Sequence, residues 1–116
     1  MLQMKPFQGV QKQGSNSLAI SDWYLYLIRC RDESLYTGIS TDVNRRFHQH
    51  QGEGNAGSKY LKGRGPLTLV FQKRLGNKTL ALKVEGKVKK LSKGRKENLV
   101  EVPGRIKEIM KGKVLF

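Results

Sequence analysis

Five side chains in this sequence have the types and the spacing needed to cleave a phosphodiester. Tyr26 and Tyr36 lie ten residues apart, Arg46 and His50 follow at helical spacing, and a lone carboxylate, Glu85, comes later in a basic stretch. Hydrolysis requires an activated water, positive charge at the phosphoryl oxygens and help for the leaving oxygen. A tyrosine whose pKa is lowered by nearby cations can activate the water, an arginine matches a phosphate, and one glutamate can hold a Mg²⁺ ion that keeps several waters. The set predicts metal-assisted hydrolysis with a single ion.

Each member of the set also has a simpler explanation. Tyrosines are common strand formers, and Arg46 and His50 could lie on an exposed helix face. Glu85 could pair with Lys89 one helical turn later, for only roughly 0.3–0.5 kcal/mol. The order and spacing of the residues, rather than any one of them, favour a shared site.

The chain carries a large positive charge. Its 116 residues include 23 Lys and Arg against 9 Asp and Glu, which gives a formal net charge of +14. Such a charge indicates a polyanionic partner. DNA is the favoured partner, RNA is less favoured, and an anionic membrane surface is the lesser option. A merely basic protein remains the alternative.

The remaining composition narrows the class of protein. Cys30 is the only cysteine, so the chain has no internal disulfide and no cysteine-based zinc site, which fits a reducing cytoplasm. No window reaches the roughly 20 apolar residues of a membrane span. The N-terminus lacks the apolar run of a signal peptide. We therefore expect a cytoplasmic protein with no membrane partner.

The sequence pattern predicts one domain over residues 22–101, between a flexible tail (1–21) and a C-terminal extension (102–116). One or two helical turns are expected in the extension. Strands are expected at 23–30, 34–39 and 66–74, and helices from 40–42 to about 51, from 77 or 78 to about 91, and over 93–101.

The first two strands predict a β-hairpin whose loop length decides where the tyrosines point. With a two-residue loop, Tyr26 and Tyr36 lie on opposite faces of the sheet. With a three-residue loop, Cys30 faces Ser34, Tyr26 pairs near Gly38, and both tyrosines share one face. A shared tyrosine site therefore requires the odd loop.

The first predicted helix begins at residues 40–42, with a hydroxyl cap and an acid in the first turn. Val43, Phe47 and His50 fall on one stripe, with Arg46 at its edge, which places the guanidinium near the core boundary.

Basic residues recur in two later segments. A glycine-rich loop over 52–65 contains groups suited to phosphate contacts and stacking. In the helix after residue 77, Glu85 borders a buried stripe formed by Leu80, Val84, Val88 and Leu91. The candidate nucleic-acid contacts are Lys59, Tyr60, Lys62, Arg64, Lys83, Lys87 and Lys90.

The ordered set of motifs resembles the GIY-YIG nuclease domain, and most closely its small single-domain bacterial members, the YhbQ-like proteins. The resemblance covers about residues 23–100 and rests on Trp-Tyr-Leu-Tyr-Leu-Ile from Trp23, on Tyr36-Thr37-Gly38, and on the segment from Ile39 to His50. It implies an α+β fold, a three-stranded antiparallel sheet flanked by helices. The first triplet, Tyr-Leu-Tyr, departs from the family in lacking its leading glycine.

The resemblance also implies residue roles. Tyr26 and Tyr36 match the two motif tyrosines, Arg46 the helix arginine, His50 a position held by histidine or tyrosine, and Glu85 the metal-binding glutamate. Gly38 matches an invariant glycine that would leave room for substrate. Many members also carry a later asparagine, for which Asn98 is the candidate without a secure alignment.

The sequence thus predicts an endonuclease that hydrolyses DNA with one Mg²⁺ or Mn²⁺ ion and little sequence preference. Structured or branched DNA is a candidate substrate, and repair or recombination a candidate role. The alternatives are a nucleic-acid-binding module with weak or no cleavage, and a scaffold that binds an acidic protein.

Overall fold

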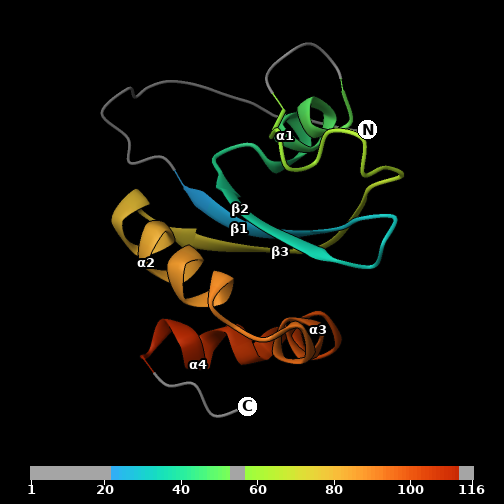
Figure 1. The fold of residues 1–116 in the computed structure, drawn as a ribbon. Coiled ribbons are helices and arrows are strands. Elements are labelled where there is room, and N and C mark those ends of the chain that lie inside the picture. Colours follow the sequence, from blue (N-terminus) through green and yellow to red (C-terminus); the bar gives the residue numbers. More distant parts are fainter. Residues whose placement is uncertain (1–21, 53–56, 113–116) are drawn as a thin grey trace, which may run out of the picture.

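The computed structural model describes residues 22–52 and 57–112, and shows a three-stranded antiparallel sheet with helices on both faces (Figure 1). The strand order is β2-β1-β3. The predicted α+β fold is confirmed, and the predicted tail over 1–21 lies outside the described residues. The elements in chain order are β1 (Trp23–Arg29), β2 (Leu35–Ser40), α1 (Val43–His50), β3 (Thr68–Gly76), α2 (Lys78–Lys89), α3 (Lys93–Glu101), the 3₁₀ turn η1 (Pro103–Arg105) and α4 (Ile106–Met110).

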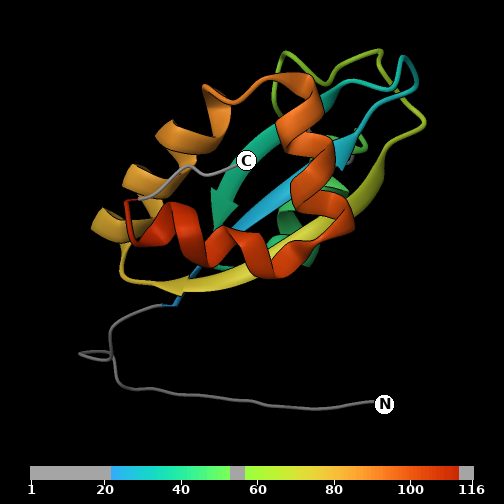
Figure 2. The same cartoon turned by 90° about the horizontal axis from the view of Figure 1, so that it is seen from below.

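The central strand β1 is buried on both faces and divides the apolar interior into two clusters. The helices α2, α3 and α4 lie across one face (Figure 2), and α1 covers the other together with the segment after it (Figure 1). The cluster under α2–α4 contains Leu25, Leu27, Val84, Val88, Leu99, Ile106 and Ile109, and the cluster under α1 contains Tyr26, Ile28, Cys30, Val43 and Leu61. Tyr26 thus belongs to the α1 side.

The turn between β1 and β2 is the three-residue loop that a shared tyrosine site requires. The amide of Cys30 donates a hydrogen bond to the carbonyl of Ser34 at 2.9 Å. Glu33 adopts a φ of 70°, the left-handed conformation that commonly ends such loops.

The register of the hairpin places both tyrosines on one face. Tyr26 pairs with Gly38, and Ile28 pairs with Tyr36. Because side chains alternate along a strand, and directly opposed residues share a face, Tyr26 and Tyr36 both point toward α1. The expectation of an odd loop is confirmed.

The start of α1 differs in detail from the prediction of a hydroxyl cap. The cap is Asp42, whose side chain accepts a hydrogen bond from the amide of Arg45 at 3.1 Å. Ser40 instead accepts a hydrogen bond from the amide of Asp42 at 2.9 Å and so orders the approach to the helix. A carboxylate at this position also complements the positive end of the helix.

A charged contact ties α3 to the end of β1. The guanidinium of Arg29 donates two hydrogen bonds, both of 2.7 Å, to the carboxylate of Glu97, and Lys93 donates a third at 2.8 Å. The hydrogen bond from Arg29, followed by that from Lys93, lowers the pKa of Glu97 to about 2. The bidentate geometry fixes the orientation of α3 against the sheet.

Candidate active site

The side chain of Tyr26, on β1, lies over the edge strand β2 at Gly38. A Cβ atom at Gly38 would lie 2.4 Å from both Cζ and Oη of Tyr26, which is far inside van der Waals contact. The missing side chain therefore makes room for the Tyr26 ring, whereas the family resemblance implied room for substrate. Only glycine lets this phenol pass over β2 toward the open edge of the sheet.

His50, in the last turn of α1, contacts both Tyr26 and Tyr36. Its imidazole is only 5% exposed, and its Nε2 lies 2.8 Å from Oη of Tyr26. The backbone amide of Ser58 donates a hydrogen bond to Nδ1 at 3.1 Å. The ring centroids of His50 lie 5.9 Å from Tyr26 and 5.4 Å from Tyr36. The side chain is thus held at both nitrogens.

Arg46 lies on α1 one helical turn before His50 and also approaches Tyr26. The side chain is half-buried, as its place beside the apolar stripe of α1 predicted. Its Nη1 donates a hydrogen bond to Oε1 of Gln49 at 2.9 Å, and the guanidinium also hydrogen-bonds Tyr26. The cation is therefore oriented by two partners before any substrate binds.

Glu85 approaches from the other side of the sheet, on α2. Its side chain is 18% exposed and forms an ion pair with Lys89 at 3.5 Å, the simpler partner that the sequence offered. The carboxylate also lies close enough to Tyr26 for its negative charge to raise the pKa of that phenol. The tyrosines, Arg46 and His50 thus lie together, and the charge of Glu85 reaches Tyr26 from α2.

Burial controls the protonation of the Tyr26 phenol and the His50 imidazole. Burial, followed by the neighbouring Tyr36, raises the pKa of Tyr26 to about 12, although Arg46 acts in the opposite direction. Burial, followed by the charge of Arg46, lowers the pKa of His50 to about 4. The expected lowering of the tyrosine pKa by cations is therefore wrong for Tyr26, because desolvation outweighs them. Both side chains are neutral at pH 7.

The neutral, buried His50 makes stability depend on pH. Because its pKa is about 4 in the folded protein and about 6.5 in an unfolded chain, the unfolded state binds more protons between these values. The free energy of unfolding should fall as the pH decreases through this window, by about 3 kcal/mol at most. We expect His50→Gln to remove this dependence and His48→Gln, at an exposed histidine of the same helix, to retain it. Urea unfolding of both variants between about pH 7 and pH 4 measures the difference, and equal pH profiles would contradict the assignment.

The loop over residues 57–67 adds an aromatic and cationic edge to the site. Tyr60 is 46% exposed and stacks on Tyr36, with ring centroids 5.7 Å apart. The guanidinium of Arg64 lies 4.3 Å from the centre of the Tyr60 ring and forms an ion pair with Asp32 at 3.1 Å. These contacts join the loop to the hairpin turn and leave Tyr60 accessible beside Tyr36.

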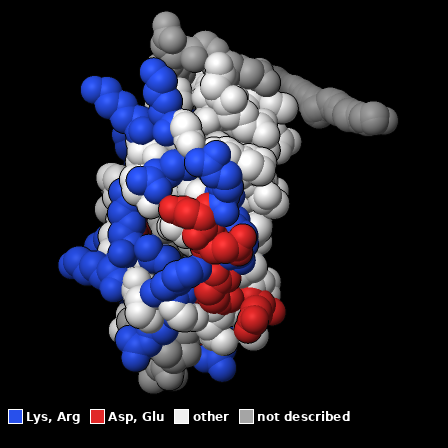
Figure 3. All heavy atoms as spheres, turned by 45° about the vertical axis from the view of Figure 1, so that its right-hand side comes forward, with Lys and Arg blue, Asp and Glu red and all other residues white. Residues whose placement is uncertain are grey.

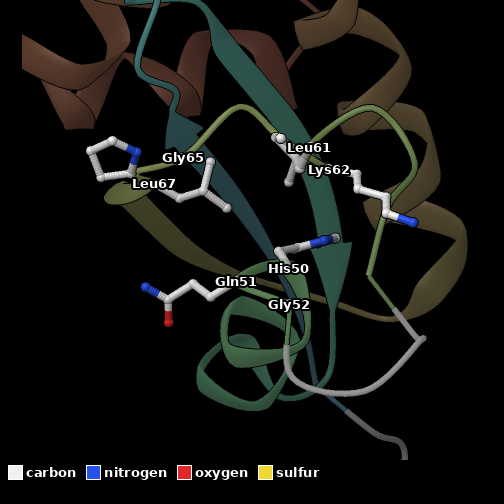
Figure 4. Close-up of a pocket in the computed structure, with 9 residues that line it drawn as sticks. His50, Gln51, Gly52, Leu61, Lys62, Gly65 and Leu67 are labelled. Carbon is white, nitrogen blue, oxygen red and sulfur yellow. The ribbon is translucent and has the colours of Figure 1, made fainter.

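A hollow of about 270 Å³ borders His50 and Lys62 but not the tyrosines or Glu85. It lies between the end of α1 and the segment from Leu61 to Leu67, and Figure 4 shows His50 and Leu61 at its wall. None of Tyr26, Tyr36 and Glu85 lines it. The hollow therefore flanks the tyrosine site on the His50 side.

A model of the GIY-YIG catalytic domain matches residues 22–98 of the chain. The chain belongs to the GIY-YIG family. UPF0213 proteins from Citrobacter koseri and from Escherichia coli O127:H6, the latter named YhbQ, are 52% and 53% identical to it over 81 residues, or 70% of this chain and 79% of each relative. The resemblance to small YhbQ-like members is confirmed.

Two solved structures of similar proteins are solution NMR structures. A UPF0213 protein from Bacillus halodurans is 43% identical with a TM-score of 0.46, and a protein from E. faecalis is 28% identical with a TM-score of 0.51. Each comparison covers 70% of this chain and 84% of the other. The second similarity supports the GIY-YIG fold described above.

GIY-YIG domains are usually nucleases that use a divalent metal ion, and the donors present here fit a hard cation. Glu85 offers carboxylate oxygens at the edge of the tyrosine site. Over residues 22–52 and 57–112, no group of three or more His, Cys, Asp or Glu could hold a metal. One carboxylate with retained waters and substrate phosphates is a common way to bind Mg²⁺. Glu85 could hold one ion in this way.

Much of one face of the GIY-YIG domain is positively charged (Figure 3). Figure 3 shows Lys and Arg side chains over much of one face, with Asp and Glu gathered in a single band. Glu97 and Asp32 are compensated by Arg29 and Arg64. The exposed lysines among the candidate contacts are Lys59 and Lys62 in the loop and Lys83, Lys87 and Lys90 on or next to α2. Within the described segments, no helix is long and apolar enough to cross a membrane.

Two residues at the site of this GIY-YIG domain were not predicted. Ser58 holds His50 through its backbone, so its side-chain type carries no signal. A Cβ at Gly57 would lie 2.5 Å from the carbonyl oxygen of Gln49, so only glycine lets the loop approach α1 this closely. Gly57 is one of several glycines in this loop, so the sequence gave no reason to select it.

Proposed function

We propose that this protein is a divalent-metal-dependent endonuclease that hydrolyses DNA phosphodiester bonds with little sequence preference, in DNA repair or recombination. The convergence of Tyr26, Tyr36, Arg46 and His50, with the charge of Glu85 acting on the same phenol, carries the proposal. The two tyrosines, the arginine and the buried histidine come together from β1, β2 and α1.

The roles follow from what each group can do. Glu85 binds one Mg²⁺ or Mn²⁺ ion, and the bound ion supplies charge stabilisation and a more acidic water. Arg46 neutralises charge on the scissile phosphate with a guanidinium that is already oriented. Tyr26 and Tyr36 together position the reacting groups, and one of the two serves as the general base that activates the attacking water. His50 holds Tyr26 in place.

The low sequence preference is inferred from the kind of contact available. Lysines such as Lys59 and Lys62 are flexible point charges that bind phosphates and carry no information on the base. Tyr60 is exposed, and an unpaired base could stack on its ring in place of the Arg64 guanidinium, whatever the base, because every base has a π-face. The surface therefore favours the DNA backbone and unpaired bases over a particular sequence.

A nicking assay on supercoiled plasmid and on branched DNA tests the proposal. With Mg²⁺ or Mn²⁺ the wild type should nick DNA, EDTA should stop the reaction, and Arg46→Ala should lower the rate about 1000-fold. Glu85→Ala should be inactive. If wild type and both variants show the same background, the catalytic proposal is wrong.

The lysines of α2 are expected to set the salt dependence of DNA binding. Replacing Lys83, Lys87 and Lys90 with glutamine should flatten the slope of log K against log salt by about three, since each lost phosphate contact reduces it by about one. Fluorescence anisotropy with a labelled duplex between about 0.05 and 0.2 M salt measures this slope. An unchanged slope would place the DNA on another face. Tight, salt-sensitive binding without cleavage under any divalent metal would instead favour a binding module.

A further inference from the structure

The hydrogen bonds around His50 determine which of its nitrogens carries the proton. A backbone N–H can only donate, so the contact from Ser58 at 3.1 Å makes Nδ1 an acceptor. Burial lowers the pKa of His50 to about 4, so the ring is neutral and has a single N–H. That hydrogen must lie on Nε2, which faces Oη of Tyr26 at 2.8 Å.

This tautomer determines the direction of the hydrogen bonds at Tyr26. Nε2–H of His50 donates to the phenol oxygen, and the hydrogen-bonded guanidinium of Arg46 can also only donate. Neither neighbour can accept the phenol hydrogen. The O–H of Tyr26 is therefore directed away from both His50 and Arg46 and is free to donate to another acceptor.

We propose that the backbone amide of Ser58 is a positioning element that, through the tautomer of His50, makes Tyr26 a hydrogen-bond donor to a phosphate oxygen of the DNA. The inference rests on the proposed nuclease function and deepens it. Tyr26 does not serve as the base that takes a proton from water. Of the two tyrosines, that role is left to Tyr36.

Gly57 is the residue that lets the amide reach His50. A Cβ at this position would meet backbone atoms at 2.5 Å (the oxygen of Gln49) and at 3.1 Å (Cα of His50). These atoms belong to the last turn of α1 and cannot move aside cheaply. Any side chain at Gly57 should therefore push the Ser58 amide away from Nδ1.

Nitrogen NMR of the metal-free protein tests the tautomer without requiring activity. In wild type, ¹⁵N shifts should show His50 protonated at Nε2 and unprotonated at Nδ1 at pH 7. Gly57→Ala should give a mixture of tautomers. Gly65→Ala is the matched control, because a Cβ there meets its nearest atom at an ordinary 3.8 Å. A wild-type His50 protonated at Nδ1, or a Gly57→Ala spectrum identical to wild type, would overturn the proposal.

A double-mutant cycle tests the consequence for Tyr26. His50→Gln, whose amide can still donate, should retain kcat within about tenfold, whereas His50→Leu should lower kcat about 100-fold with little change in KM. In a Tyr26→Phe background, His50→Leu should have almost no further effect, because the hydroxyl that it orients is gone. An undiminished loss in that background would show that His50 acts independently of Tyr26. If every variant and the wild type are inactive, the nuclease proposal fails while the NMR result still decides the tautomer.

Discussion

Glu85→Gln is expected to lower metal-dependent cleavage by about three orders of magnitude while leaving the fold intact. The amide keeps the size of the side chain but loses the charge that a hard divalent cation requires. Loss of several kcal/mol of charge stabilisation in the transition state corresponds to such a factor. Cleavage rates at saturating DNA, measured across a Mg²⁺ titration, check the prediction. The circular dichroism spectrum should match that of the wild type.

Lys89→Gln is the control that separates the two possible tasks of this carboxylate. It removes the ion pair of 3.5 Å with Glu85 but leaves the carboxylate in place. Since an exposed helical pair of this kind contributes roughly 0.3–0.5 kcal/mol, the variant should keep its rate within about threefold. Equal losses in Glu85→Gln and Lys89→Gln would show that the ion pair, and not a metal ligand, explains the importance of Glu85.

Gly38→Ala is expected to reduce cleavage about 100-fold and to destabilise the fold by about 1–3 kcal/mol. The new methyl group would lie 2.4 Å from Cζ and Oη of Tyr26, so the ring must move and its 2.8 Å contact with His50 must break. Overpacking of a buried position has a cost of this size. A displacement of about 1 Å at a catalytic group is sufficient for a loss of this factor. Single-turnover cleavage and urea denaturation provide the two measurements.

Gly94→Ala is the matched control for this substitution. Gly94 lies in α3, and a Cβ there would meet nothing within 4 Å. Alanine in a helix is favoured over glycine by about 1 kcal/mol, so this variant should be slightly more stable than wild type and fully active. If Gly38→Ala also retained full activity, the position of the Tyr26 ring over β2 would not matter for catalysis.

The elements of the fold could be predicted because their signals are local. The helix α3 was expected over 93–101 and lies at Lys93–Glu101. The strand β1 was expected over 23–30 and lies at Trp23–Arg29. Apolar periodicity and cap residues are properties of neighbouring positions in the chain, so they can be recognised without the tertiary structure. Even the exception at α1 is local, because Asp42 replaced a hydroxyl as the cap only two residues from Ser40.

The sequence by itself determined the candidate residues, from Tyr26 to Glu85, and the condition that an odd hairpin loop must bring the tyrosines together. Only the tertiary structure decided what surrounds them. Gly38 accommodates the ring of Tyr26, and the Ser58 amide reaches the imidazole of His50. These contacts depend on packing between separate elements and on backbone atoms, which have the same chemistry at nearly every position and leave no trace in residue types. The direction of the Tyr26 hydroxyl hydrogen therefore could not be predicted from the sequence, although the sequence contains every residue that determines it.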